Sequence, residues 1–473
     1  MSHRDSEAQG RAVRLNSSCL KAALDWLLKG VEWSGIVLRE DCSWTPMLLS
    51  AAALLWAWSD ELTLIDRFEA VRRIMLHLFL PQREFAGSYQ AFTKILRRWS
   101  EPLIDCVRLA LCERMQRELR DCWLTLGFAL FGVDGSRAEL PRTRSNELAF
   151  SILRHPRKSR KGRKLRKRLK LSNRKALSRK VTSPQLWLTT MWHVGSGLPW
   201  DWRIGPADSS ERAHMLALLS TLPPGSMIAA DAGFVGYEYV KAILDAGHQL
   251  LLRVGSNVRL LKNLGYVRES GHTVYLWPDR KGSQGNLPLV LRLVVAHNGR
   301  HPVFLVTSEL SEERLSDRQV VELYGRRWGI ELFYRSLKQT FQRRKLRSAS
   351  AGNVELEMNW SFVGLWAMGL YALSQLDLAE VSPRRSSVAQ ILRAFRRMMR
   401  DYLHPSERGR TLRERLRTAL IDDYRRVNKT SRDYPRKKHE APPGPPRILK
   451  ASPSQIQRAR ALRRQPSEKG LTA

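Results

Sequence analysis

The sequence predicts a mixed α/β protein in which helices flank a central sheet. Two observations point to this fold class. Apolar runs of strand length alternate with helical patterns between residues 124 and 254, as in sheets with helical connections. Helical periodicity dominates residues 1–123 and 346–427 on either side. The chain has 473 residues, of which 43% are hydrophobic, enough for two or three domains with apolar cores.

Residues 1–123 form a predicted helical N-terminal region. Apolar residues recur at helical spacing in Leu48–Leu54, Leu62–Phe79 and Tyr89–Trp99. No familiar DNA-binding motif stands out there, so two interpretations remain open. The region either recognises a DNA end or forms a helical cap.

A strand and a basic loop are predicted next. The apolar run Leu124–Val133 leads into Asp134-Gly135-Ser136, so we expect Asp134 at the end of a buried strand, before a turn. Residues 154–180 are densely basic and should stay solvated and mobile, because like charges repel one another. We expect this loop to follow DNA phosphates without reading sequence, although it could be a generic basic loop. Six of its basic residues carry this expectation: Arg157, Lys158, Arg160, Lys161, Arg163 and Lys164.

A hairpin and a helix are predicted after the basic loop. Leu186–His193 and Leu198–Ile204 have strand character and are separated by a Gly-rich turn. Asp208 stands three residues before Glu211, which resembles a capping box at the start of the following helix.

Two further strands complete the predicted catalytic sheet. The short apolar strand Met227–Ala230 runs directly into Asp231, and Gln249–Val254 follows after a helix. The catalytic domain is therefore expected to comprise residues 124–254 and 304–345, interrupted by a β-rich insertion at 255–303.

The C-terminal part is predicted to be helical over residues 346–427. Its most apolar stretch, Trp360–Leu373, is shorter than the roughly 20 residues that span a bilayer, so we expect a buried helix and no membrane contact. Residues 428–473 are rich in Pro, Lys and Arg, and this composition favours a basic disordered tail.

The charge balance and the cysteines indicate the kind of partner and the compartment. The chain has 81 Lys and Arg against 45 Asp and Glu, a formal net charge of +36. Such an excess favours a polyanion, above all a nucleic acid. The five cysteines lack the spacing of metal-binding pairs, and their odd number argues against a disulfide framework. The sequence therefore predicts a nucleic-acid-binding protein of a reducing cytoplasm.

One predicted helix, from Ser316 to about Phe341, carries a stripe of functional side chains. Tyr324, Arg327, Glu331 and Lys338 stand at −7, −4, 0 and +7 relative to Glu331. At roughly 100° per residue these offsets fall within a stripe about 60° wide. A carboxylate among phosphate-binding groups suits a metal-bound phosphodiester. The alternative is a surface stripe of ion pairs.

Three acidic residues on separate elements form the predicted active site. Asp134 and Asp231 each follow an apolar strand, and Glu331 lies on the helix. An Asp at the end of a strand can equally be a turn residue, which is the commoner role for an Asp beside a Gly. Taken singly, either Asp could have this role. Together, carboxylate oxygens are the ligands that Mg²⁺ and Mn²⁺ prefer, and two such ions about 3.5–4 Å apart catalyse phosphodiester cleavage.

These residues also carry a family resemblance. The chain resembles the bacterial insertion-sequence transposases of the DDE type with the Y-R-E-K signature. Its signature residues, Tyr324, Arg327, Glu331 and Lys338, match in identity and spacing, and the resemblance covers residues 125–345. The two Asp motifs match as Asp134-Gly135-Ser136 and Ala230-Asp231-Ala232-Gly233-Phe234, and residues 255–303 fit the family's β-rich insertion. Ala232 is a departure, since many relatives have Arg there and use it to contact phosphate.

The resemblance implies a ribonuclease-H-like fold and a cut-and-paste DNA transposase. It implies that Asp134, Asp231 and Glu331 are catalytic and bind two Mg²⁺ (or Mn²⁺) ions, and that Tyr324, Arg327 and Lys338 hold phosphates of the transposon end. Relatives bind the terminal inverted repeats as homodimers, excise through a hairpin and join the 3′-hydroxyl to target DNA. Two alternatives are a catalytically silent DNA-binding relative and a ribonuclease-H-like nuclease without strand transfer.

Two tryptophans have separate predictions. Trp277, in the insertion, could stack on a flipped base, but a core or strand-edge position is the favoured interpretation. Trp328, between Arg327 and Glu331, is predicted to be a packing residue.

Overall fold

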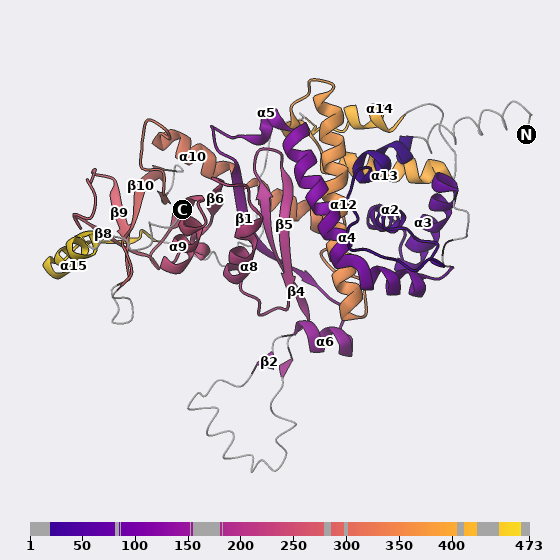
Figure 1. Ribbon diagram of the computed structural model, residues 1–473, viewed down its shortest axis with the longest axis horizontal. Coiled ribbons are helices and arrows are strands. Elements are labelled where there is room, and N and C mark those ends of the chain that lie inside the picture. Colours follow the sequence, from indigo (N-terminus) through magenta and orange to yellow (C-terminus); the bar gives the residue numbers. More distant parts are fainter. Residues whose placement is uncertain are drawn as a thin grey trace, which may run out of the picture.

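One large sheet organises the protein. The structure is a computed structural model that describes residues 19–80, 85, 87–151, 153–154, 180–181, 183–278, 285–297, 301–403, 411–422 and 444–464. Ten strands lie in the order β12-β8-β9-β10-β11-β7-β6-β1-β4-β5, with helices packed around them (Figure 1). The predicted mixed α/β class is confirmed. The strands are β1 (Leu130–Glu139), β4 (Gln185–His193), β5 (Leu198–Gly205), β6 (Met227–Ala230), β7 (Gln249–Val254), β8 (Arg259–Lys262), β9 (Thr273–Leu276), β10 (Leu289–His297), β11 (Pro302–Thr307) and β12 (Arg447–Lys450).

Five of these strands form the ribonuclease-H-like core. β1 is central, β4 and β5 form an antiparallel hairpin on one side of it, and β6 and β7 lie parallel to it on the other. The helices α8 (Glu211–Leu218) and α9 (Tyr237–Asp245) connect β5 to β6 and β6 to β7. Among these five strands β4 alone runs antiparallel to β1, and this order is the one expected of a ribonuclease-H-like fold.

The first strand differs from its prediction. β1 begins at Leu130 and continues through Asp134 to Glu139, so Asp134-Gly135-Ser136 is extended strand and not a turn. The reason is β4, which pairs with β1 along its length, from Phe131 opposite His193 to Glu139 opposite Gln185. A local sequence pattern cannot show this pairing, because the partner lies about fifty residues away.

The predicted β-rich insertion continues the main sheet. β10 pairs with β11, and β11 pairs with β7 of the core. β8 and β9 follow outward, so the strands of residues 255–303 extend one sheet away from the helical layer (Figure 1).

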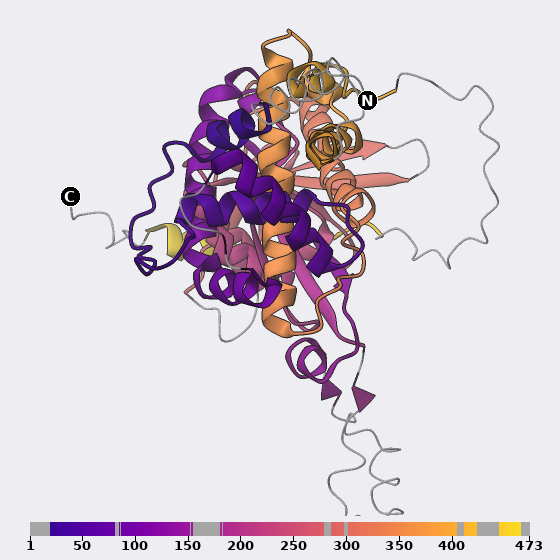
Figure 2. The same cartoon turned by 90° about the vertical axis from the view of Figure 1, so that its right-hand side faces the viewer.

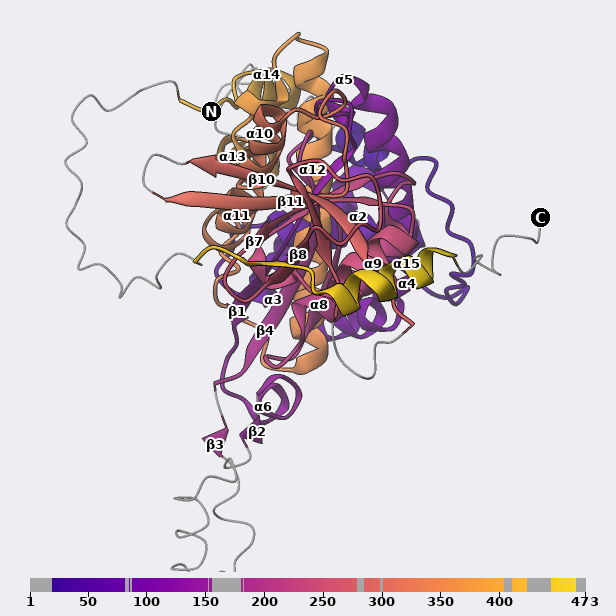
Figure 3. The same cartoon turned by 90° about the vertical axis from the view of Figure 1, so that its left-hand side faces the viewer.

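Part of the predicted disordered tail is ordered. β12 pairs in parallel with β8 at the edge of the sheet, from Arg447 opposite Arg259 to Lys450 opposite Lys262. The helix α15 (Pro453–Arg464) then lies across that end of the molecule (Figure 3). Ala459 is fully buried in a cluster with Trp277, and Ile456 and Leu462 pack on it. The prediction was wrong for residues 444–464 because Arg and Lys dominate the composition and hide this short apolar stripe. The rest of the predicted tail lies outside the described residues.

A layer of helices from the N-terminal and C-terminal regions packs beside β5. Figure 2 shows α12 (Ala351–Asp377) running through this layer next to the N-terminal helices. Trp58 Nε1 donates to Gly364 O at 2.8 Å and Trp360 Nε1 donates to Ser100 Oγ at 2.6 Å, which ties α12 to two N-terminal helices. The other members are α2 (Pro46–Trp58), α3 (Leu64–Phe79), α4 (Tyr89–Glu118), α5 (Arg120–Trp123), α13 (Val388–Leu403) and α14 (Leu412–Arg417).

The helix α12 is buried on almost every side, as expected for the apolar stretch Trp360–Leu373. No helix in the described part of the chain is long and apolar enough to cross a membrane. Residues of the N-terminal and C-terminal regions share one hydrophobic core with the central sheet. The N-terminal helices are therefore packed into the body of the protein, and their role in DNA recognition stays a prediction.

A buried arginine joins the helical layer to the sequence that follows the signature. Arg343 is 3% exposed. Its guanidinium donates to Ser361 Oγ at 2.7 Å, to Phe341 O at 2.6 Å and to Ala57 O at 3.3 Å. Burial lowers the pKa of Arg343, and the nearby carboxylate of Glu357 opposes that change.

Glu357 is the matching buried acid. It is 1% exposed and accepts hydrogen bonds from Ser348 N at 3.0 Å, Ser348 Oγ at 2.8 Å and Arg347 N at 3.1 Å. The buried side chains of Arg343 and Glu357 therefore hold the segment after the signature on α12.

Candidate active site

The sheet brings the two predicted aspartates to neighbouring positions. β1 and β6 run parallel, with Gly132 beside Ala229, and the register continued by two residues sets Asp134 beside Asp231. Asp134 Oδ1 accepts from Gly135 N at 2.8 Å, and Asp231 Oδ1 accepts from Ala232 N at 2.8 Å. Each aspartate thus has one oxygen held by the next backbone amide, which fixes its rotamer.

The signature helix is not straight. It comprises α10 (Asp317–Arg326), a turn at Arg327 and Trp328, α11 (Gly329–Arg335) and a π-helical segment, η4 (Ser336–Thr340). The amides of 327, 328, 330 and 331 bond three residues back, which tightens the helix, whereas the amide of 341 bonds five residues back, which loosens it. The uniform 100° spacing behind the predicted stripe is therefore wrong in detail.

Glu331 faces the two aspartates. Burial raises the pKa of Glu331 and the positive charge of Arg327 opposes that rise. The negative charges of Asp134 and Asp231 raise its pKa further. Burial likewise raises the pKa of Asp134, with Arg327 acting against it and Asp231 with it. The three predicted carboxylates therefore share one electrostatic environment.

Arg327 is 7% exposed, and its positive charge acts on both Asp134 and Glu331. Its side chain crosses Gly132, where an added Cβ would lie 3.5 Å from Arg327 Cγ, and its guanidinium lies 5.3 Å from the ring centre of Tyr324. The buried Arg327 Nε has no hydrogen-bond partner among the described residues. A buried guanidinium donor facing a site in this way suits an anionic ligand.

Tyr324 and Lys338 complete the signature. Tyr324 Oη donates to Asp231 Oδ1 at 3.4 Å, and burial raises the pKa of this phenol to about 12. Burial lowers the pKa of Lys338, Arg344 adds to that effect, and the charge of Asp134 opposes it. Both side chains therefore interact with an aspartate of the predicted site.

Tyr334 was not predicted and anchors the helix that carries Glu331. Its hydroxyl donates to the carbonyl oxygen of Asp134 at 2.8 Å and lies 3.0 Å from Thr190 Oγ1 on β4. Tyr334 is buried in the sheet-facing side of α11, so it fixes α11 against β1. A pattern of apolar and polar residues gives no signal for this contact, because a Tyr at helical spacing reads as an ordinary core residue.

Glu211 supplies a fourth carboxylate that the sequence analysis missed. Its helix begins at Ser210, whose side chain accepts from Ala213 N at 3.3 Å, so the predicted capping box of Asp208 and Glu211 is wrong. Glu211 instead lies against β1. A Cβ added at Gly135 would lie 2.1 Å from Glu211 Oε1. Burial raises the pKa of Glu211, and the charges of Asp134 and Asp231 add to the rise.

The donor set fits a divalent cation in its chemistry. The negative charges of Asp134 and Asp231 raise the pKa of both Glu211 and Glu331, so four carboxylates interact here. Carboxylate oxygens are the preferred ligands of Mg²⁺ and Mn²⁺. Within the described ranges, no three acidic, His or Cys side chains lie close enough to hold one ion jointly. Binding would therefore require these side chains to draw together as the cation offsets their repulsion.

The remaining predicted site residues have different outcomes. Arg157, Lys158, Arg160, Lys161, Arg163 and Lys164 lie outside the described residues. Trp277 is 6% exposed, donates from Nε1 to Asn286 O at 2.8 Å and is covered by Arg458, so it is a packing residue, as favoured. Trp328 was predicted to pack but is 54% exposed, because the tightened turn at Arg327 directs it outward.

The contribution of Glu211 can be tested by Glu211→Gln, which keeps its shape and removes its charge. We expect DNA cleavage to fall by about 10- to 100-fold and the Mg²⁺ concentration for half-maximal activity to rise, as for groups that support metal ligands. The measurement is cleavage rate against Mg²⁺ concentration. Glu238→Gln, at the exposed first turn of the next helix, is the matched control and should leave both quantities unchanged. Equal behaviour of the two variants would remove Glu211 from the site.

Two comparisons with known proteins find transposases. A family model described as the transposase DDE domain matches residues 179–365, which include Asp231 and Glu331 but not Asp134. The chain is 26% identical over 269 residues to transposase InsG of insertion sequence element IS4 from Escherichia coli strain K12, covering 54% of each protein. It thus spans about half the length of this curated relative.

A solved structure was also compared. A piggyBac transposase in a synaptic complex with hairpin DNA aligns with a TM-score of 0.39 and 13% sequence identity, covering 90% of this chain and 88% of that one. Residues 179–365 thus match a transposase DDE domain, and the chain is similar to a transposase of a bacterial insertion sequence.

Proposed function

We propose that this protein cuts DNA at the ends of its own insertion sequence and joins those ends to target DNA. The observation that carries the proposal is electrostatic: the charges of Asp134 and Asp231, at the ends of neighbouring strands, act on Glu331, and the buried Arg327 acts on both Asp134 and Glu331. Three carboxylates beside a buried guanidinium suit a cation-assisted reaction of a phosphodiester.

The proposed reaction requires no energy source beyond the DNA itself. A water attacks the phosphorus at the transposon end, the bond to the 3′-oxygen breaks, and that oxygen leaves as a 3′-hydroxyl. In the hairpin route, this hydroxyl attacks the opposite strand, releases the flanking DNA, and a second water reopens the hairpin. In the final step the 3′-hydroxyl attacks a target phosphodiester and displaces a target 3′-oxygen.

The protein's own residues have proposed roles in this reaction. Asp134, Asp231 and Glu331 would hold two Mg²⁺ or Mn²⁺ ions, which stabilise the attacking and leaving oxygens when bound. Arg327 and Lys338 would bind the phosphate oxygens, and Tyr324 would orient Asp231 and the bound strand. Glu211 would support this set from α8, and Tyr334 would keep Glu331 in register with Asp134.

The DNA partners are part of the proposal. Double-stranded DNA, as inverted repeats and as target, is the polyanion that best suits a net charge of +36. The basic loop at 154–180 would follow phosphates without reading sequence, and a homodimer on DNA would pair the two ends. β2 (Leu153–Arg154) and β3 (Lys180–Val181) pair with each other, so the loop starts and ends at one place.

The test is a cleavage and joining assay. The DNA flanking the coding region supplies the inverted repeats, and the purified protein should nick them only with Mg²⁺ or Mn²⁺ and then yield target-joined product. Cleavage without any joined product would favour the ribonuclease-H-like nuclease. Binding without metal-dependent cleavage would favour the catalytically silent relative.

A further inference from the structure

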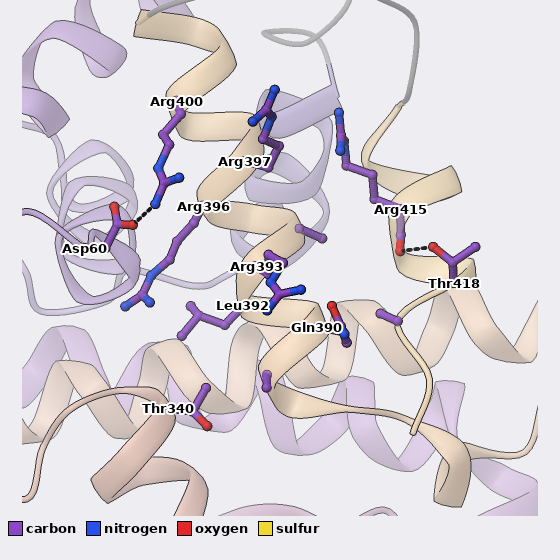
Figure 4. Close-up of a pocket in the computed structure, with 13 residues that line it drawn as sticks. Asp60, Thr340, Gln390, Leu392, Arg393, Arg396, Arg397, Arg400, Arg415 and Thr418 are labelled. Carbon is purple, nitrogen blue, oxygen red and sulfur yellow. Dashed lines mark hydrogen bonds and ion pairs between the residues drawn. The ribbon is translucent and has the colours of Figure 1, made fainter. Parts of the chain in front are cut away.

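A cluster of arginines surrounds a cavity away from the carboxylates. The cavity has a volume of about 520 Å³ and lies between α13 and α14 (Figure 4). We call it the arginine pocket, after the five arginines that line it: Arg393, Arg396, Arg397, Arg400 and Arg415. Figure 4 shows four of them along α13 and the fifth reaching in from α14.

The spacing of these arginines is costly for a helix. Arg396, Arg397 and Arg400 stand three, four and seven residues after Arg393, so all four lie on one face of α13. Like charges at such spacings destabilise a helix. Burial lowers the pKa of Arg396, Asp60 opposes this, and the charge of Arg400 adds to it. The face therefore concentrates positive charge beside the pocket.

Two of the pocket's arginines hold α13 on α2. Asp60 is the one acidic residue among the pocket's lining residues, and it pairs with Arg400. Arg396 Nε donates to Trp58 O at 2.8 Å. These two arginines thus have structural roles that tie α13 to α2, whereas Arg393 is exposed to solvent at the pocket.

The pocket adjoins the helix that carries the signature. Thr340, the last residue of η4, lines it, and α13 packs against η4. Lys338 lies two residues before Thr340, and the negative charge of Asp134 raises its pKa against the effect of burial. The signature helix thus contributes Lys338 to the surroundings of the carboxylates and Thr340 to the arginine pocket.

We propose that the arginine pocket binds backbone phosphates of the DNA that the active site cuts. The inference rests on the proposed function and adds a second contact, outside the Y-R-E-K signature. Guanidinium groups match phosphate oxygens in pairs, and contacts to the backbone do not depend on base sequence. The ligand class is therefore the phosphodiesters of duplex DNA, held where the strand leaves the active site.

The test needs no knowledge of the inverted repeats. The Arg393→Gln/Arg397→Gln double variant of the full chain is titrated with a labelled duplex of arbitrary sequence at several salt concentrations, without divalent metal. Each lost phosphate contact reduces the slope of log K against log salt by about 1. We expect a slope about 2 units shallower than that of the unaltered protein and at least tenfold weaker binding at 0.1 M salt.

Matched variants separate this effect from general loss of charge or fold. Arg413→Gln/Arg417→Gln removes the same charge from exposed positions of α14 outside the pocket and should leave most of the slope unchanged. Arg393→Lys/Arg397→Lys keeps the charge and should restore most of the slope. An unaltered salt slope in the Gln pair would overturn the inference, as would an equal loss in both Gln pairs. A Gln pair that keeps the slope but loses self-association would assign the pocket to an acidic surface of a second copy instead.

The outcome is independent of the catalytic proposal. Glu331→Gln should keep the full salt slope and lose only metal-dependent cleavage. Failure of the pocket would leave cleavage by the unaltered protein intact, whereas failure of the proposed function would appear as absent cleavage with the pocket's slope effect retained.

Discussion

Replacement of Glu331 by Gln, or of Asp231 by Asn, is expected to reduce metal-dependent cleavage of the insertion-sequence ends by more than about 100-fold. Loss of a group that only supports a metal ligand costs about 10- to 100-fold, so loss of a ligand should cost more. Both variants keep the shape of the side chain. The Asp231 carboxylate accepts hydrogen bonds from Ala232 N and from the Tyr324 hydroxyl. The measurement is the single-turnover rate of strand nicking in Mg²⁺ and in Mn²⁺.

Two controls make the result specific. DNA binding without metal should be at least as strong in both variants, since each removes a negative charge near the phosphates. Glu322→Gln, on the exposed side of α10, alters a carboxylate of the same signature helix and should cleave normally. Cleavage by Glu331→Gln at the rate of the Glu322→Gln control would refute the active-site assignment.

Replacement of Arg343 by Met is expected to lower the free energy of unfolding by about 3–5 kcal/mol, as when one member of a buried charged group is removed. The change would leave Ala57 O and Ser361 Oγ without their donor and would remove the positive charge that faces the buried Glu357. Chemical denaturation of the full chain measures it. Arg344→Met, at the exposed neighbouring position, should change stability by no more than about 0.5 kcal/mol. Similar losses in both variants would show that Arg343 has no special structural role.

Much of the sheet could be predicted because its signals are local. Met227–Ala230 is a short apolar run that ends at an acid, and the hairpin strands are separated by a Gly-rich turn. The signature residues lie within fifteen positions of one another, so their spacing alone placed them near one another. The structure has two features that the spacing does not predict. They are the tightened turn that exposes Trp328 and the π-helical segment that carries Lys338.

The missed features all depend on contacts between distant segments. Tyr334 matters because it meets Asp134, and Glu211 matters because Gly135 lets it approach. Neither residue differs locally from an ordinary core tyrosine or a helix-starting glutamate. The ordering of residues 444–464 has the same cause, since the side chains of Arg447–Lys450 are exposed and the strand forms by pairing with β8.

The parallel pairing of β12 with β8 affects the order in which a ribosome can complete this protein. Roughly 190 residues separate Arg259 from its partner Arg447. At 5–20 residues per second, translation leaves the outer edge of β8 unpaired for about 10–40 s. An open strand edge invites association with other chains, so newly made copies pass through a period of aggregation risk that ends when the C-terminal segment emerges.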